Sequence, residues 1–202
     1  MSTAKLPKVL FNLQRTSVLL ADADSMGQSI LGQMLTGFGA RHVTRCDDIA
    51  EVRRLLGTHT FDLVIIDPAS FGPAGYETIG WMRRELSPPN KHVSILVATG
   101  HTESTRVGQL RDSGANFVVS KPLSASILLE RILWLSREKR PYVETASYVG
   151  PDRRWHDAAL PEGVEGRRIR DREVAARIAA GGEMNQADID LIMSAQVQGS
   201  VT

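Results

Sequence analysis

Four polar side chains in this 202-residue sequence stand at or just after the ends of short apolar runs. They are two carboxylates, a hydroxyl and an amine: Asp22 after residues 17–21, Asp67 after 63–66, Thr99 after 93–98, and Lys121 after 117–119. Short apolar runs without polar alternation are typical of strands buried on both faces of a parallel sheet. Open α/β sheets bind their ligands at the carboxyl ends of such strands. The pattern therefore predicts an acidic pocket that accepts a phosphoryl group. The alternative is that Asp22 and Asp67 only cap the helices that follow them.

Helical periodicity between these runs supplies the elements that would position the four side chains. The expected helices cover residues 25–38, 49–57, 76 to the Pro88-Pro89 pair, 104–113 and 124–138, and a further short strand lies near 42–44. Five strands alternating with five helices predict an α/β fold with right-handed crossovers. We expect a doubly wound five-stranded parallel sheet that is covered on both faces.

Composition indicates an ordinary soluble protein, with 42% hydrophobic residues, 23% charged residues and a formal charge of +1. The single cysteine, Cys46, excludes an internal disulfide, and we expect it to be a small buried residue rather than a reactive thiol. No run of 18 apolar residues is present, and the N-terminus lacks the apolar core of a signal peptide. We expect a cytoplasmic protein that binds no membrane.

The composition of the sequence changes after Arg140, where Pro, Gly and charged residues replace the regular apolar pattern. The expected organisation is an N-terminal extension (1–16), an α/β domain (17–140), a mostly irregular linker (141–182) and a C-terminal amphipathic helix (183–202). Residues 141–202 hold seven Arg and ten Asp or Glu. This acidic balance argues against a fused DNA-binding domain, so we expect no DNA partner.

Residues 17–138 resemble the receiver domain of two-component response regulators, which has a flavodoxin-like fold. The residues that carry the resemblance are the acidic turn at 18–24, Asp67 followed by Gly75 and Glu77, Thr99, and the Lys121-Pro122 pair. The resemblance implies that Asp67 accepts a phosphoryl group from a histidine kinase or phosphotransfer protein. It also implies that Lys121 and Thr99 bind phosphoryl oxygens, and that Mg²⁺ is held by Asp22, Asp67 and the backbone carbonyl of Ala69. No enzymatic activity is expected beyond phosphotransfer to the domain itself and its reversal.

One departure from the family pattern bears on this chemistry. Receivers usually carry two adjacent acids after the first strand, and the second binds the metal directly, whereas this sequence has Ala23. Loss of one hard oxygen ligand predicts weaker Mg²⁺ binding. Two hypotheses follow: a receiver with weakened metal dependence, or a degenerate receiver that acts as a phosphorylation-independent docking module. A second departure is Val118, where an aromatic residue usually couples to the threonine; Phe117 should face the opposite side of its strand.

The linker resembles the tails of stand-alone receivers common in alphaproteobacteria, with a Gly-Pro-Asp-Arg-Arg element at residues 150–154. Four arginines could form an anion site for phosphate, a cyclic dinucleotide or an acidic protein: Arg153, Arg154, Arg167 and Arg168. The alternative is that they are solvated and interleaved with acidic neighbours.

The last helix, expected at residues 186–195 with Asn185 as its N-cap, carries an apolar stripe of Ile189, Ile192 and Met193. It resembles the N-terminal peptide of the flagellar motor switch protein, which the phosphorylated chemotaxis receiver binds. The resemblance implies docking of the helix in a groove, on its own receiver or on another copy, and a downstream partner of the flagellar or chemotaxis type. The alternative is an ordinary capped amphipathic helix.

Overall fold

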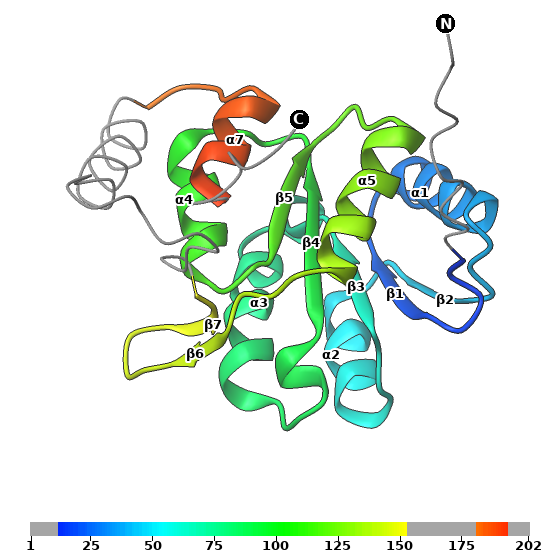
Figure 1. Ribbon diagram of the computed structural model, residues 1–202, viewed down its shortest axis with the longest axis horizontal. Coiled ribbons are helices and arrows are strands. Elements are labelled where there is room, and N and C mark those ends of the chain that lie inside the picture. The colour runs from blue at the N-terminus through cyan, green and yellow to red at the C-terminus, as the bar shows by residue number, and fades with distance from the viewer. Residues whose placement is uncertain (1–11, 153–180, 194–202) are drawn as a thin grey trace, which may run out of the picture.

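The computed structural model describes residues 12–152 and 181–193, and its centre is a five-stranded parallel sheet (Figure 1). The order across the sheet is β2-β1-β3-β4-β5, and every neighbouring pair is parallel. The strands are β1 (Ser17–Ala21), β2 (His42–Cys46), β3 (Leu63–Ile66), β4 (Ser94–Thr99) and β5 (Phe117–Ser120). The predicted doubly wound fold is confirmed.

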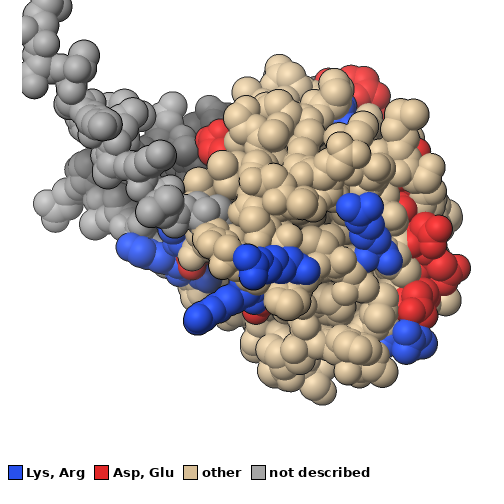
Figure 2. Space-filling view, turned by 90° about the vertical axis from the view of Figure 1, so that its right-hand side faces the viewer, with Lys and Arg blue, Asp and Glu red and all other residues tan. Residues whose placement is uncertain are grey.

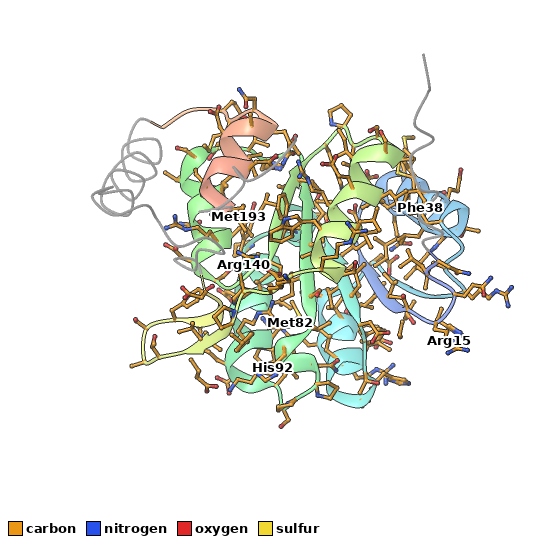
Figure 3. All side chains as sticks on the ribbon, viewed as in Figure 1. Arg15, Phe38, Met82, His92, Arg140 and Met193 are labelled. Carbon is orange, nitrogen blue, oxygen red and sulfur yellow. The ribbon has the colours of Figure 1, made fainter. Side chains whose placement is uncertain are left out.

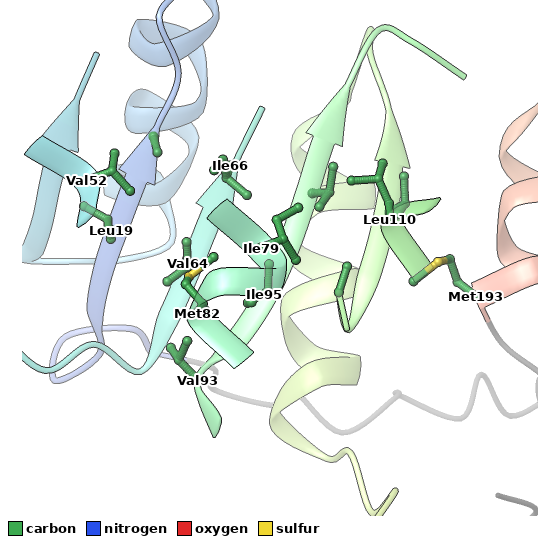
Figure 4. Close-up of a cluster of buried hydrophobic side chains, with 14 of the residues drawn as sticks. Leu19, Val52, Val64, Ile66, Ile79, Met82, Val93, Ile95, Leu110 and Met193 are labelled. Carbon is green, nitrogen blue, oxygen red and sulfur yellow. The ribbon is translucent and has the colours of Figure 1, made fainter. Parts of the chain in front are cut away.

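Helices cover both faces of this sheet. The helices α1 (Ser25–Gly37) and α5 (Ala125–Ser136) pack on one face, and α2 (Ile49–Thr58), α3 (Pro73–Glu85) and α4 (Ser104–Asp112) pack on the other. Alternate strand residues enter the two layers: Leu19 and Val64 belong to the α2–α3–α4 side (Figure 4), whereas Leu20 and Ile65 belong to the α1–α5 side. Because both faces are buried, the strands need no polar alternation, which explains the apolar runs in the sequence.

Side-chain caps fix where several helices begin. Asp24, Asp48 and Ser124 accept hydrogen bonds from backbone N–H groups in the first turns of α1, α2 and α5. Helix α3 begins at Pro73, three residues before the predicted start at Tyr76, because proline at the first helical position has a suitable φ and needs no N–H partner. The loop predicted after Asp67 contains a 3₁₀ turn, η1 (Pro68–Phe71), and a second one, η2 (Asn90–His92), precedes β4.

The predicted linker, expected to be mostly irregular over residues 141–182, begins with an ordered hairpin of β6 (Tyr142–Glu144) and β7 (Val149–Pro151). Gly150 packs against Gly114 so closely that a Cβ at Gly150 would lie 2.9 Å from the Cα of Gly114. The hairpin also covers Arg83, whose guanidinium is 5.7 Å from the Tyr142 ring. The Gly-Pro part of the tail element therefore has a packing role.

Among the described residues Arg83 is the largest fully buried side chain, and it joins α3 to two other segments of the chain. Its side chain donates hydrogen bonds to the backbone carbonyls of Lys91, Val93 and Gly114 and to Oδ1 of Asn116, at 2.7–2.9 Å. With 1% of its surface exposed, it has no solvent to replace these acceptors. It therefore fixes the α3 layer to the segments that enter β4 and β5.

The C-terminal helix α7 (Gln186–Met193) folds back onto the same domain, beside α4 and β5 (Figure 1). Asn185 accepts a hydrogen bond from the N–H of Asp188, as expected of the N-cap. The rest of the predicted helix, residues 194–195, lies outside the described residues, as do Arg153, Arg154, Arg167 and Arg168.

None of the helices in the described part of the chain has the length and apolar character of a membrane span.

On the side of the molecule formed by α1 and the β2 edge, Lys and Arg side chains are separated by uncharged surface, and Asp and Glu side chains gather at one margin (Figure 2).

Candidate functional site

Asp22, Asp67 and Lys121 meet at the carboxyl edge of the sheet. Lys121 Nζ donates hydrogen bonds to Oδ2 of Asp22 at 2.7 Å and to Oδ2 of Asp67 at 2.8 Å. The three residues follow β1, β3 and β5, so the parallel register of the sheet brings them to one edge. Asp22 is fully buried and Asp67 is 8% exposed, which leaves the second carboxylate at the surface of the pocket.

The remaining carboxylate oxygens accept backbone hydrogen bonds. Asp67 Oδ1 accepts from the N–H of Ala69 at 3.0 Å, and Asp22 Oδ1 accepts from the N–H of Asp24 at 2.9 Å. Burial of Lys121 disfavours its charge, but the hydrogen bonds that it donates to Asp22 and Asp67 outweigh that effect and raise the pKa of Lys121 above its ordinary value. The site at neutral pH is thus an ammonium held between two carboxylates.

Thr99 is placed at the end of β4 and is fully buried. Its Oγ1 accepts a hydrogen bond from the N–H of His101 at 3.1 Å, and its carbonyl accepts one from the N–H of Lys121 at 2.8 Å. The hydroxyl proton of Thr99 is not used in the bond with His101 and can be donated to a ligand. The side chain of His101 is exposed.

The part of the chain that builds this site matches a known protein family. The family model described as "Response regulator receiver domain" matches residues 18–133, which is more than half of the chain. The chain belongs to the response regulator receiver family. The receiver domain accounts for the α/β core, and the segments after residue 133 are additional to the match.

Individual relatives agree with this assignment. The chemotaxis protein CheY of Pseudomonas aeruginosa is 24% identical over 115 residues, which cover 57% of this chain and 91% of CheY. Among solved structures, CheY4 of Vibrio cholerae has a TM-score of 0.53 at 21% identity, over 59% of this chain and 98% of that one. A putative response regulator of Chloroflexus aurantiacus has a TM-score of 0.55 at 23% identity, over 61% and 98%. These structures share the fold.

The receiver pocket offers few ligands for a divalent cation. Ala23 supplies no carboxylate, and the carbonyl of Ala69 accepts a hydrogen bond from the N–H of Gly72 at 3.1 Å. Within the described residues, no group of three or more His, Cys, Asp and Glu could hold a metal ion. Two carboxylates and a carbonyl, completed by water, still suit Mg²⁺, which commonly binds one or two protein carboxylates. The residues present therefore fit a Mg²⁺ site with a reduced set of protein ligands.

Asp24 is engaged as a helix cap. Its side chain accepts hydrogen bonds from Met26 and Gly27 N–H groups at 3.2 and 3.0 Å and is the N-cap of α1. Both of its oxygens therefore stabilise the first turn of α1. Asp24 Oδ2 nevertheless lies beside the pocket, because a Cβ at Gly27 would be 3.0 Å from it and 2.9 Å from Asp22 Oδ2.

Two further residues shape the pocket, and neither belongs to the motifs from which the site was predicted. Ser70 Oγ accepts from the N–H of Ala23 and donates to the carbonyl of Asp67, both at 2.9 Å, so it fastens the two acidic loops together. Gly27 leaves space at the carboxylates, because a Cβ there would lie 2.9 Å from Asp22 Oδ2 and 3.3 Å from Lys121 Nζ. The roles of the Ser70 hydroxyl and of the missing Cβ at Gly27 could not be predicted from the sequence, because they depend on which segments of the chain are adjacent at the pocket.

The side chain of Val118 faces the α4 layer of the core, whereas that of Phe117 faces the α5 layer. The prediction that Phe117 points to the opposite side of β5 is confirmed. The ring of Phe117 packs edge-on against Trp134 at 5.2 Å, so it has a structural place away from Thr99.

The predicted partner-binding residues Ile189, Ile192 and Met193 lie against the receiver itself and not at an open surface. They are 0%, 2% and 2% exposed and belong to the same cluster as Leu110 of α4; Figure 4 shows Met193 and Leu110 at the same end of that cluster. Of the two arrangements expected from the sequence, docking in the same chain is the one in this structure.

Proposed function

We propose that this chain is a single-receiver response regulator that accepts a phosphoryl group on Asp67 and signals through protein contacts. The observation that carries the proposal is Lys121 Nζ, which bonds both Asp22 and Asp67 at the carboxyl edge of the sheet. A phosphoryl group on Asp67 would bring negative oxygens to a place where an ammonium already stands. The family of the chain supports the same chemistry.

In the proposed reaction, an Asp67 carboxylate oxygen attacks the phosphorus of a phosphohistidine in a histidine kinase or phosphotransfer protein. The new P–O bond forms as the P–N bond breaks, and the imidazole nitrogen keeps the bonding electron pair. Lys121 exchanges its bond with Asp67 for one with a phosphoryl oxygen, and Thr99 donates its hydroxyl proton to another. Water attack on the acyl phosphate reverses the modification; no other activity is proposed.

Asp22, Asp67 and the Ala69 carbonyl are the groups that would hold Mg²⁺. When bound, Mg²⁺ neutralises charge on the phosphoryl oxygens. Because Ala23 removes one ligand and Lys121 occupies the space between the two carboxylates, we propose that the affinity for Mg²⁺ is lower than in a receiver with paired acids.

A second function is favoured by the same two features. A pocket in which Lys121 already bonds both carboxylates, and which lacks one acid, suits a degenerate receiver that acts as a phosphorylation-independent module. Its tail would then carry the function, by protein contacts or by binding a cyclic dinucleotide or another anion at Arg153, Arg154, Arg167 and Arg168.

The test is to mix the full chain with acetyl phosphate or with candidate kinases over a series of Mg²⁺ concentrations. Acyl phosphate is detected by phosphate-binding gel electrophoresis and intact mass. We expect a gain of one phosphoryl group that is absent in Asp67→Asn and reaches half-maximum at a lower Mg²⁺ concentration in Ala23→Asp. Failure of every donor to modify wild type, with Asp67→Asn acting as wild type in the cell, would leave only the second function.

Receivers in general interact with kinases and with downstream targets. For this chain we propose a cytoplasmic histidine kinase or phosphotransfer partner, and a protein target of the flagellar or chemotaxis type suggested by the pattern of α7. Pull-down of wild type and Asp67→Asn with and without acetyl phosphate tests whether target binding follows the modification.

A further inference from the structure

Residues 182–193 cover a surface of the receiver formed by α4, β5 and α5, here called the α4–β5–α5 surface. Four side chains carry the apolar part of the contact and are 0–6% exposed: Met184, Ile189, Ile192 and Met193. The spacing of the last three places them on one face of α7. They complete the cluster that contains Val107 of α4 and Val118 of β5.

Gln186 recognises the edge of the sheet. Strand β5 is the last strand in the order, so its outer backbone groups have no neighbouring strand. The Gln186 amide meets them: Oε1 accepts from the N–H of Ser120 at 2.8 Å and Nε2 donates to the carbonyl of Val118 at 3.2 Å. A single side-chain amide thus pairs with the backbone of an edge strand as another strand would.

A charged pair fixes the other side of α7. Asp190 Oδ2 accepts a hydrogen bond from Arg131 of α5 at 2.6 Å, while Asp190 Oδ1 accepts from Gln186 Nε2, also at 2.6 Å. Arg140 reaches the carbonyl of Met193 at 3.4 Å, near the end of the helix (Figure 3). Gln186 and Asp190 therefore form a continuous polar connection from β5 to α5, one helical turn in length.

The residues that precede α7 are hydrogen-bonded to the loop that follows β4 and to the start of α4. The carbonyl of Gly182 accepts from the N–H of Ser104 at 3.0 Å, and the N–H of Met184 donates to the carbonyl of Thr102 at 2.9 Å. Helix α4 has no side-chain cap at Glu103, so the Gly182 carbonyl satisfies one of its first N–H groups. The tail is attached by backbone pairing as well as by its helix.

The receiver domain is complete without residues 182–193. The family match ends at residue 133, and the solved receivers cited above align over 98% of their own length with 59–61% of this chain. Residues 153–180 connect the hairpin to the segment through a part of the chain outside the described residues.

We propose that the α4–β5–α5 surface is a binding site for an amphipathic helix and that residues 182–193 are its tethered occupant. The helix it takes carries Gln and Asp four residues apart, for β5 and Arg131, with Ile and Met on the same face. A partner helix with this pattern binds by displacing α7, so the tail sets the threshold for partner binding. The proposal goes beyond the phosphotransfer function and does not depend on it.

The experiment uses a fluorescent peptide of residues 181–193 and the full chain, with binding followed by anisotropy and oligomeric state by light scattering. In the full-chain variant Gln186→Ala/Asp190→Ala, α7 keeps its apolar face but loses its polar contacts. We expect this variant to bind the peptide at least about tenfold more tightly than wild type, because a weakened tethered helix competes less. The matched control is Ala187→Gln, at an exposed position of α7, which should bind as wild type does.

A charge exchange separates recognition from simple loss of folding. We add Arg131→Glu to the Gln186→Ala/Asp190→Ala variant. This change should abolish binding of the natural peptide and allow binding of a peptide with Asp190→Arg. Circular dichroism checks that each variant is folded. The proposal of a tethered occupant in the same chain would be overturned if wild type and the Gln186→Ala/Asp190→Ala variant bound the peptide equally, or if neither bound it. It would also be overturned if the charge exchange had no effect, or if wild type were a dimer that the peptide dissociates.

Discussion

Replacing Lys121 with methionine would leave two carboxylates facing each other without their shared cation. Side-chain exposures are 22% for Lys121, 0% for Asp22 and 10% for Asp67, so most of the interaction is removed from solvent. Removing one partner of a buried ion pair costs about 3–5 kcal/mol, and the partial exposure of Lys121 places the expected loss in the free energy of unfolding at about 2–3 kcal/mol. Urea unfolding followed by circular dichroism measures it.

A matched control and the pH dependence make the prediction specific. Glu144→Gln removes an ion pair to Lys91 in which the carboxylate is 61% exposed, and it should cost only about 0–1 kcal/mol. In wild type the raised pKa of Lys121 means that its contribution is complete below about pH 10 and is lost as the pH rises through the folded-state pKa. A loss below 1 kcal/mol in Lys121→Met would refute this account of the pocket.

Three other outcomes follow from buried groups. Because burial raises the pKa of the Cys46 thiol, it should react with a thiol reagent at pH 7–8 only after unfolding, and rapid reaction in the folded chain would contradict this. Arg83→Met should lower the free energy of unfolding by about 3–5 kcal/mol in urea titrations, because it removes four hydrogen bonds and takes the Arg83 donor from the buried carbonyls of Val93 and Gly114. The Lys91 carbonyl and Asn116 Oδ1 keep bonds from Tyr142 and Ile95. An effect under 1 kcal/mol would show that the two carbonyls find other donors. Gly150→Ala should increase amide hydrogen exchange in residues 142–151 without affecting β1, since the added Cβ meets Gly114; unchanged exchange would contradict that close packing.

The sheet could be predicted from the sequence because its strands are buried on both faces and its helices are amphipathic. The expected bounds of β1 and β3 agree with the structure, and α1 begins at Ser25 as expected. The hairpin after Pro141 was not predictable from periodicity, because each of its strands has three residues and depends on contacts with α3 and the Gly114 turn. Local pattern cannot indicate a segment whose stability comes from distant partners.

The positions of the pocket residues were also predictable, since residues that follow parallel strands must meet at one edge. The bonding within the pocket was not. Nothing in the spacing of Asp22 and Lys121 says that one ammonium serves two carboxylates, or that Ser70 joins the two acidic loops. The apolar stripe of α7 was visible, yet a stripe alone does not say what covers it; the pairing of Gln186 with β5 required the edge of the sheet.

The position of α7 in the chain has a consequence for synthesis on the ribosome. Ser120 and its partner Gln186 are 66 residues apart in sequence. At a translation rate of roughly 5–20 residues per second, the nascent receiver waits about 3–13 s after β5 is made before its covering helix exists. During that interval Val107, Leu110 and Val118 lack the apolar neighbours that bury them in the finished protein. We therefore expect the nascent chain to expose apolar side chains at the surface that α7 later covers.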